Sequence, residues 1–163
     1  MTIWVSCSLR CSGVRRRAVD RVVRHVLSEL GHASVGIAVT FVGDRTMRRL
    51  NREYRRKDRP TDVLAFAMGE ASQLPPNRSM LGDVVISVPM ARRQAKEAGR
   101  TTDCELTVLI VHGLLHLCGY DHERGGQEAR RMFRKEREVL GKLGRMPKIL
   151  VEPNSSGSRH GLV

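Results

Sequence analysis

The sequence lacks a long apolar run and the layout of a secretory signal. No stretch approaches the roughly 18 consecutive apolar residues of a membrane-spanning helix, which argues against a membrane-embedded protein. The first residues, MTIWVSCSLRCSGVRRR, carry their apolar part before their basic part, the reverse of a secretory signal. We therefore expect a cytoplasmic protein without a membrane partner.

Cysteine is scarce and shows no repeated pairing motif. The four cysteines (Cys7, Cys11, Cys104 and Cys118) contain no CxxC pairs. This usage is typical of reduced thiols in a cytosolic protein rather than of a disulfide framework. Cys7 and Cys11 are expected to be small buried side chains rather than metal ligands.

Acidic residues are also in deficit. The chain has 29 Lys and Arg against 17 Asp and Glu, a formal charge of +12. This imbalance favours a polyanionic partner, with nucleic acid first and an anionic membrane surface second. Residues 45–59, RTMRRLNREYRRKDR, concentrate eight basic side chains. Because aromatic residues are few, phosphate contacts are expected to dominate over base stacking.

Hydrophobic periodicity predicts alternating strands and helices along the chain. Strands are predicted at 2–9, 35–42, 62–68 and 81–88, and helices at 14–30, 44–54, 89–99, 102–118 and 127–143. The last helix is expected to turn Met132, Phe133, Val139 and Leu140 inward. A polar loop containing Pro75 and Pro76 separates the last two strands.

These elements predict an α+β fold. We expect one compact domain over residues 1–150, with a roughly four-stranded mixed sheet packed against about five helices. Residues 151–163 are polar and are predicted to form a disordered tail. Asp44 is the expected N-cap of the second helix, and Thr102 with Glu105 has capping-box spacing at the start of the fourth.

The predicted helix at 102–118 is apolar nearly all round and is therefore expected to be buried in the C-terminal half. It leads into HGLLHLCGYDH at 112–122, in which His112, His116 and His122 follow the spacing H-x-x-x-H-x-x-G-x-x-H. Residues four apart on a helix share a face, so His112 and His116 can bind one ion together. Gly119 allows a sharp exit that returns His122 to the same point.

Three imidazoles on an apolar helix predict a metal site, because burying them without a metal would need three separate polar partners. Three protein ligands leave a tetrahedral position open, as in catalytic zinc sites. Zinc (one Zn2+) is the expected ion, although nickel or copper would also bind such a set. Asp121 either orients a ligand or caps the turn.

The spacing is that of a metzincin protease, but Gly113 stands where those enzymes carry their general-base glutamate. Glu105 lies about two turns earlier on the helix, too far to replace it. Peptide hydrolysis is therefore disfavoured. Phosphodiester cleavage fits better, since a metal can polarise a phosphoryl oxygen or supply hydroxide while the cations at 45–59 neutralise charge.

Three motifs together resemble the YbeY family, bacterial single-strand-specific endoribonucleases of ribosomal RNA maturation and ribosome quality control. They are HGLLHLCGYDH, YRRKDRPTDVLAFAM at 54–68 and LGDVVIS at 81–87, and the likeness covers residues 35–143. The resemblance implies zinc on His112, His116 and His122, a functional arginine at Arg55, and a basic groove beside the metal. It also implies single-stranded RNA as substrate, chiefly the 3′ region of 16S rRNA, and the small ribosomal subunit and its proteins as partners.

The chain departs from the family pattern at two places. Ala65 and Ala67 replace the usual serine and proline, which is expected to alter the groove wall, and Cys118 stands where an apolar residue is common. Cys118 is two positions past His116, so it faces away from the metal. Asp62 and Asp83 either hold Arg55 or a ligand histidine, or cap turns, and the structural role is favoured.

The sequence thus predicts a zinc-dependent endoribonuclease with Arg55 and His116 as catalytic residues. One alternative is an RNA-binding ribosome-assembly factor in which zinc only stabilises the fold. A metallopeptidase is the second alternative, which the missing glutamate and the +12 charge disfavour.

Overall fold

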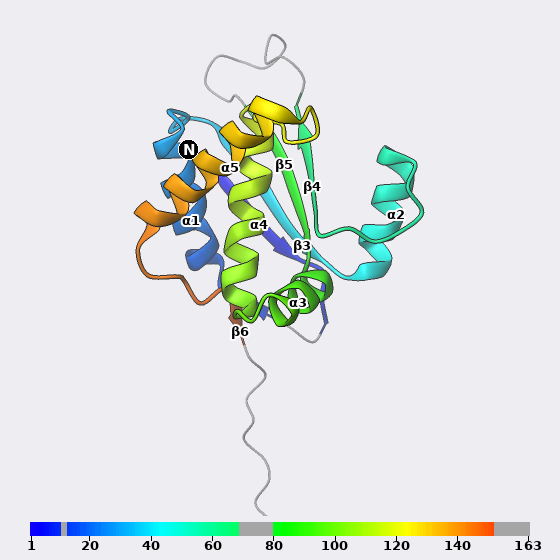
Figure 1. Ribbon diagram of the computed structural model, residues 1–163. Coiled ribbons are helices and arrows are strands. Elements are labelled where there is room, and N and C mark those ends of the chain that lie inside the picture. The colour runs from blue at the N-terminus through cyan, green and yellow to red at the C-terminus, as the bar shows by residue number, and fades with distance from the viewer. Residues whose placement is uncertain (11–12, 69–79, 152–163) are drawn as a thin grey trace, which may run out of the picture.

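The computed structural model describes residues 1–10, 13–68 and 80–151 (Figure 1). The strands are β1 (Ile3–Cys7), β2 (Gly13–Val14), β3 (Gly36–Val42), β4 (Val63–Ala67), β5 (Met80–Ser87) and β6 (Leu150–Val151). The helices are α1 (Arg16–Glu29), α2 (Asp44–Arg55), α3 (Val88–Glu97), α4 (Thr102–Leu117) and α5 (Gly126–Leu143). Cys11, the predicted loop with Pro75 and Pro76, and residues 152–163 of the predicted tail lie outside the described residues.

The main sheet has four strands in the order β1-β3-β5-β4. β1, β3 and β5 are parallel, and β4 pairs antiparallel with β5. The predicted four-stranded mixed sheet with five helices is therefore confirmed for the described residues.

A second, two-stranded ladder joins the segment before α1 to the last described residues. In it, Gly13 and Val14 of β2 pair with Val151 and Leu150 of β6. Two residues are too short to show an alternating pattern, so the sequence did not predict these strands. Val151, which was expected in the tail, belongs to this ladder.

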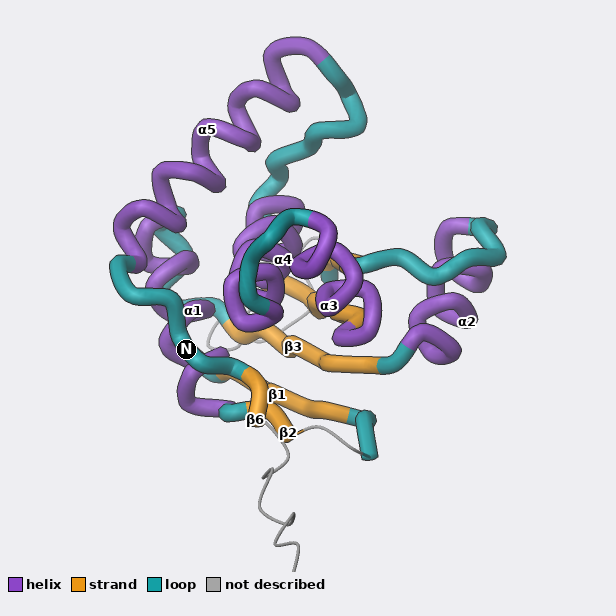
Figure 2. Tube along the Cα trace, turned by 60° about the horizontal axis from the view of Figure 1, so that its bottom comes forward, coloured by secondary structure: helices purple, strands orange, loops and turns teal. Residues whose placement is uncertain are grey.

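The helices lie mainly on one side of the sheet. Figure 2 shows α1, α3 and α4 over one face, and α5 packs on α1 and α4. The strands turn alternate side chains toward these helices, and Val39, Phe41, Val84 and Ile86 are fully buried. α4 lies at the centre of this layer, as its apolar sequence predicted, with ten buried residues.

Helix α2 packs on the opposite face of the sheet. Met47 and Leu50 pack against Val42, Leu64 and Val85, which form a small second core with Phe66. The rest of α2 is strongly basic and stands away from the body of the molecule (Figure 1). The placement of α2 therefore rests on few apolar contacts and on polar anchors at its start.

The predicted N-caps are wrong by one residue, and both corrections have a physical cause. α2 begins at Asp44 with Gly43 as its N-cap, because the Asp44 carboxylate instead accepts hydrogen bonds from Arg93 and Ser87. α4 is capped by Thr101, whose hydroxyl accepts from the N–H of Cys104 at 3.1 Å. Glu105 does not close a capping box, because its carboxylate pairs with Arg100 at 2.5 Å.

The C-terminal segment is fixed to the start of α4. The carboxylate of Asp103 accepts hydrogen bonds from the backbone N–H groups of Ile149 and Leu150, both at 2.8 Å. Arg15 adds a side-chain bond to the Leu150 carbonyl at 2.8 Å. Within the described part of the chain, no helix has the length and apolar character required to cross a membrane.

Candidate metal centre and groove

The structure brings the three predicted histidines together. His112 and His116 lie one turn apart on α4, and Gly119, with φ of 91°, turns the chain so that His122 returns to them. One ligand nitrogen from each ring lies within 4.8 Å of the others. Nε2 of His116 is 3.2 Å from Nε2 of His112, so two lone-pair positions meet at one point.

The state of these imidazoles fits a metal. Burial, followed by the neighbouring His112 and His122, lowers the pKa of His116, which favours the neutral ring that coordinates metals. Nδ1 of His122 is buried and has no hydrogen-bond partner among the described residues. A buried ring nitrogen is normally hydrogen-bonded, so this unpartnered Nδ1 is consistent with coordination of an ion.

Glu136 on α5 is a site residue that the sequence analysis missed. Its carboxylate lies 2.9 Å from Nδ1 of His112. Because an ionised carboxylate only accepts hydrogen bonds, Nδ1 carries the proton and Nε2 keeps the lone pair that binds a metal. Glu136 follows Met132 by four residues and precedes Val139 by three, so helical spacing already placed it on the buried face of α5.

Asp121 does not contact a ligand histidine. Its Oδ1 accepts a hydrogen bond from the backbone N–H of Glu123 at 2.8 Å, and its Oδ2 lies 3.3 Å from Nε of Arg124. Of the two roles left open for Asp121, the structure therefore supports the second, in which its carboxylate caps the turn after α4. The carboxylate–histidine contact expected of a metal site is made by Glu136 instead.

Gly113, at the position of the protease glutamate, packs directly on the sheet. A Cβ at this residue would lie 2.6 Å from Cγ1 of Val84 and 3.2 Å from Cγ2 of Val63. Both valines belong to the strands beneath α4. A side chain at this position would require Val84 or the helix to shift, so the packing disfavours a glutamate there.

A groove of about 770 Å³ opens beside the histidines. One wall is formed by the end of α4, the following turn and Phe133, and the other by residues 63–67 of β4 with Tyr54 and Arg55 from the end of α2. Ala65 and Ala67 line this wall, so the residues that replace the family's usual serine and proline do lie in the groove. Phe133 was expected to face inward, but it is 52% exposed because it borders the groove.

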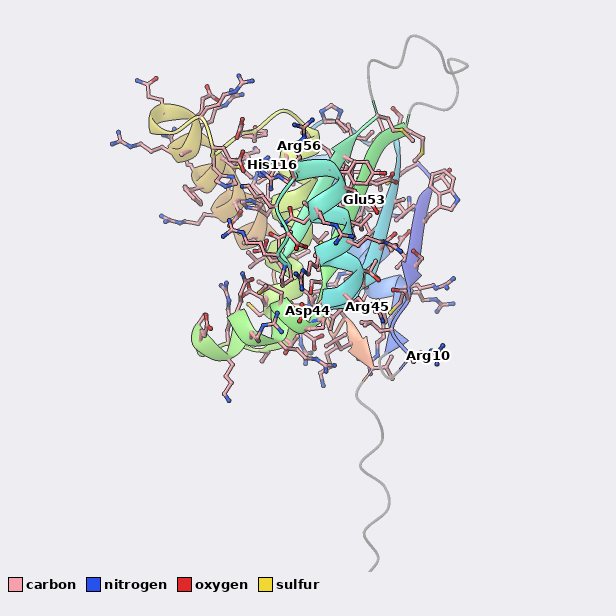
Figure 3. The ribbon with its side chains drawn as sticks, turned by 90° about the vertical axis from the view of Figure 1, so that its right-hand side faces the viewer. Arg10, Asp44, Arg45, Glu53, Arg56 and His116 are labelled. Carbon is pink, nitrogen blue, oxygen red and sulfur yellow. The ribbon has the colours of Figure 1, made fainter. Side chains whose placement is uncertain are left out.

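Arg55 reaches the groove, as expected. Its guanidinium donates a hydrogen bond to the carboxylate of Glu123 at 2.5 Å. This contact holds the pKa of Glu123 below its ordinary value. Further cations are exposed along α2 and just after it, among them Arg45 in the helix and Arg56 directly beyond its last residue (Figure 3).

Of the remaining candidates, Asp62 lines the groove while its carboxylate makes local hydrogen bonds, and Asp83 and Cys118 are not part of the groove lining. Asp62 accepts hydrogen bonds from the backbone N–H of Val63 at 2.8 Å and from the side chain of Gln94 at 3.0 Å. Asp83 alternates with Val84 and so faces the side of the sheet away from α4. Burial raises the pKa of Cys118 to about 11, and Cys118 is not among the residues that cluster as metal ligands.

Comparison with known proteins decides the family. The family model described as Endoribonuclease YbeY matches residues 10–144. The chain belongs to the YbeY family. A relative from Geobacter metallireducens, named Endoribonuclease YbeY, is 48% identical over 126 residues, covering 77% of this chain and 84% of its own.

Two further comparisons extend the relationship over most of the chain. A YbeY endoribonuclease from Aquifex aeolicus is 43% identical over 141 residues, covering 86% of this chain and 92% of its own. A solution structure of a Thermotoga maritima protein has the same fold, with a TM-score of 0.61 at 24% identity over 87% of this chain and 89% of that one. The resemblance to the YbeY family inferred from three motifs is thus confirmed.

Proposed function

We propose that this protein is a zinc-dependent endoribonuclease that cuts single-stranded RNA. The observation that carries the proposal is the juxtaposition of three imidazoles and Arg55 along one groove of about 770 Å³. The relatives from Geobacter and Aquifex are each named Endoribonuclease YbeY, which supports RNA as the substrate. The formal charge of +12 suits a polyphosphate partner.

Zinc is the proposed metal because His112 and His116 at the end of α4 and His122 in the following turn form an all-nitrogen, half-buried ligand set. The contact from Glu136 to His112 is of the kind that fixes ring orientation in zinc sites. When bound, zinc supplies Lewis-acid polarisation of a phosphoryl oxygen or a water of lowered pKa.

The protein's own side chains then account for the rest of the chemistry. His112, His116 and His122 hold the ion, and Glu136 keeps the proton on the outer nitrogen of His112. Arg55 stabilises the charge that develops on the phosphate oxygens. To do this it exchanges its hydrogen bond with Glu123 for one with the phosphate, while Glu123 is 57% exposed and can move into solvent.

We further propose that the substrate is ribosomal RNA, chiefly the 3′ region of 16S rRNA, and that the small ribosomal subunit is the partner. The basic surface of α2 supports this, because Arg45, Arg49 and Arg52 line a hollow on the outside of the helix. Such a surface can bind a second segment of a large RNA while the groove holds the cut strand. The close packing of Gly113 argues against a peptidase.

The test is cleavage of an unstructured RNA by purified protein, run beside an identically prepared His116→Ala variant. Contaminating ribonuclease would cut in both samples, so the comparison isolates this protein's activity. We expect cleavage only by the unsubstituted protein, and we expect chelation to stop it while circular dichroism shows a folded chain. Equal cleavage in both samples, or RNA binding without cleavage, would favour a zinc-stabilised ribosome-assembly factor instead.

A further inference from the structure

The few aromatic residues of this chain gather at the candidate active site. The sequence has six of them, and Tyr54, Phe66 and Phe133 all line the groove. Tyr54 and Phe133 are 65% and 52% exposed, although large aromatic side chains are stabilised by burial. Their exposure beside the histidines needs a functional explanation.

The two exposed rings lie on different walls. Tyr54 belongs to α2 and Phe133 to α5, and Figures 1 and 2 both place these helices on opposite sides of α4. The Tyr54 ring is supported edge-on by Phe66, with ring centroids 4.9 Å apart. The Phe133 ring lies 6.4 Å from the ring of His122. Each ring is therefore anchored on one side and open to the groove.

We propose that Tyr54 and Phe133 are base-stacking subsites that flank the cut phosphate, so that the groove accepts only unpaired nucleotides. The proposal rests on the endoribonuclease function proposed above. Arg55 follows Tyr54 directly, which places a phosphate-binding cation next to one stacking ring. Aromatic side chains stack on splayed bases of single-stranded RNA, whereas bases within a duplex are already stacked on their neighbours.

This arrangement selects strandedness rather than sequence. Every base has a π face, so stacking tolerates all four bases. Composition predicted that phosphate contacts dominate, and the arginines of α2 are suited to such contacts. The proposal adds base stacking within the groove. There, three of six aromatics meet at one place.

The test compares Tyr54→Leu and Phe133→Leu with Tyr54→Phe and with Trp4→Leu, which alters an exposed aromatic outside the groove lining. Two RNA strands are used, one intact and one with abasic nucleotides on both sides of the cut. We expect each leucine variant of the groove to raise KM for the intact strand about tenfold, as loss of one stacked base does. Tyr54→Phe keeps the stacking ring, so we expect it to raise KM much less than Tyr54→Leu does. We expect Trp4→Leu to leave KM unchanged.

The abasic strand separates stacking from a general disturbance of the site. With no base to stack, the unsubstituted protein and the two groove variants should share the same raised KM. A loss that persists equally on the abasic strand, or groove variants that cut the intact strand as well as the unsubstituted protein does, overturns the proposal. If the groove variants cut the intact strand normally but no longer bound a protein partner, the rings would be assigned to protein docking.

Binding of both strands, measured by fluorescence anisotropy, is scored apart from cleavage. If the protein binds RNA without cutting it, the proposed nuclease function is wrong. The stacking proposal is then tested by the ratio of the dissociation constants for the intact and abasic strands. A ratio near one for the unsubstituted protein would exclude stacking in the groove.

Discussion

Glu136 on α5 accepts a hydrogen bond from Nδ1 of His112 on α4 at 2.9 Å. This contact links two consecutive helices and sets the orientation of one ligand ring. We predict that Glu136→Gln weakens zinc binding about 10-fold to 100-fold, the usual cost of losing such a partner. Competition with a zinc-binding dye measures the effect.

The matched control for this change is Glu128→Gln, which makes the same substitution at an exposed position in the first turn of α5. It should leave zinc affinity unchanged. Equal zinc affinities for the unsubstituted protein and both variants would show that the contact with Glu136 does not contribute to zinc binding by His112.

Gly113 permits the close packing of α4 on the sheet. Because a Cβ there would lie 2.6 Å from Val84, we predict that Gly113→Ala lowers the free energy of unfolding by about 1–3 kcal/mol, the range for an overfilled core. Urea denaturation measures this. Adding Val84→Ala should recover part of the loss by making space.

Gly141 in α5 provides the opposite case. A Cβ there meets nothing within 4 Å in the described structure, so Gly141→Ala should raise the free energy of unfolding by about 0.5–1 kcal/mol through helix propensity. If Gly113→Ala stabilised the protein as Gly141→Ala does, the prediction that a Cβ at residue 113 clashes with Val84 would be wrong.

Arg55 forms an ion pair with Glu123 at 2.5 Å, so under the proposed function Glu123 would compete with substrate phosphate for Arg55. We predict that Glu123→Gln lowers KM for RNA by no more than about fivefold, because exposed ion pairs contribute only about 0–1 kcal/mol. Steady-state cleavage assays check this, with Glu53→Gln on the exposed surface of α2 as a control for net charge. In an Arg55→Ala background the Glu123 substitution should lose its effect, and an undiminished effect there would contradict competition.

Asp44 anchors the start of α2 through Arg93, whose hydrogen bond holds the pKa of Asp44 below its ordinary value. A carboxyl with a lowered pKa in the folded state stabilises the protein above its ordinary pKa. That contribution is lost as the pH falls through the folded-state value. The pair is partly exposed, so we predict that Asp44→Asn costs about 0.5–1 kcal/mol at neutral pH and progressively less below about pH 4.

Urea denaturation of both proteins between pH 7 and pH 3 measures this difference. Arg93→Gln should reproduce the same pH dependence, since it removes the other partner. A difference that stays constant down to pH 3 would mean that the Asp44–Arg93 contact adds no stability.

The main elements were predictable because each is long and strongly periodic. The four strands of the sheet and the five helices fall close to the predicted ranges. The metal ligands were predictable because His112 and His116 share a helix face and Gly119 brings His122 back within a few residues. All three ligands therefore lie within one short segment, residues 112–122, and their spacing alone predicts that they cluster.

The features that were missed depend on contacts between distant segments. Glu136 reaches His112 only because α5 packs on α4, and its position among apolar residues was the one available signal. The exposure of Phe133 follows from the groove, which exists only once β4 and α2 are in place. Asp44 leaves its expected capping role because α3 brings Arg93 beside it.

Helix α4 separates the C-terminal end of the described chain, at β6, from the candidate metal site. Asp103 at its start binds the backbone of Ile149 and Leu150, whereas His116 lies near its other end, about 20 Å away at a rise of ~1.5 Å per residue. A fusion partner or surface linker attached beyond Val151 therefore leaves from the end of α4 opposite the groove. The protein can be tethered there for single-molecule or surface-binding measurements while RNA enters freely at the other end.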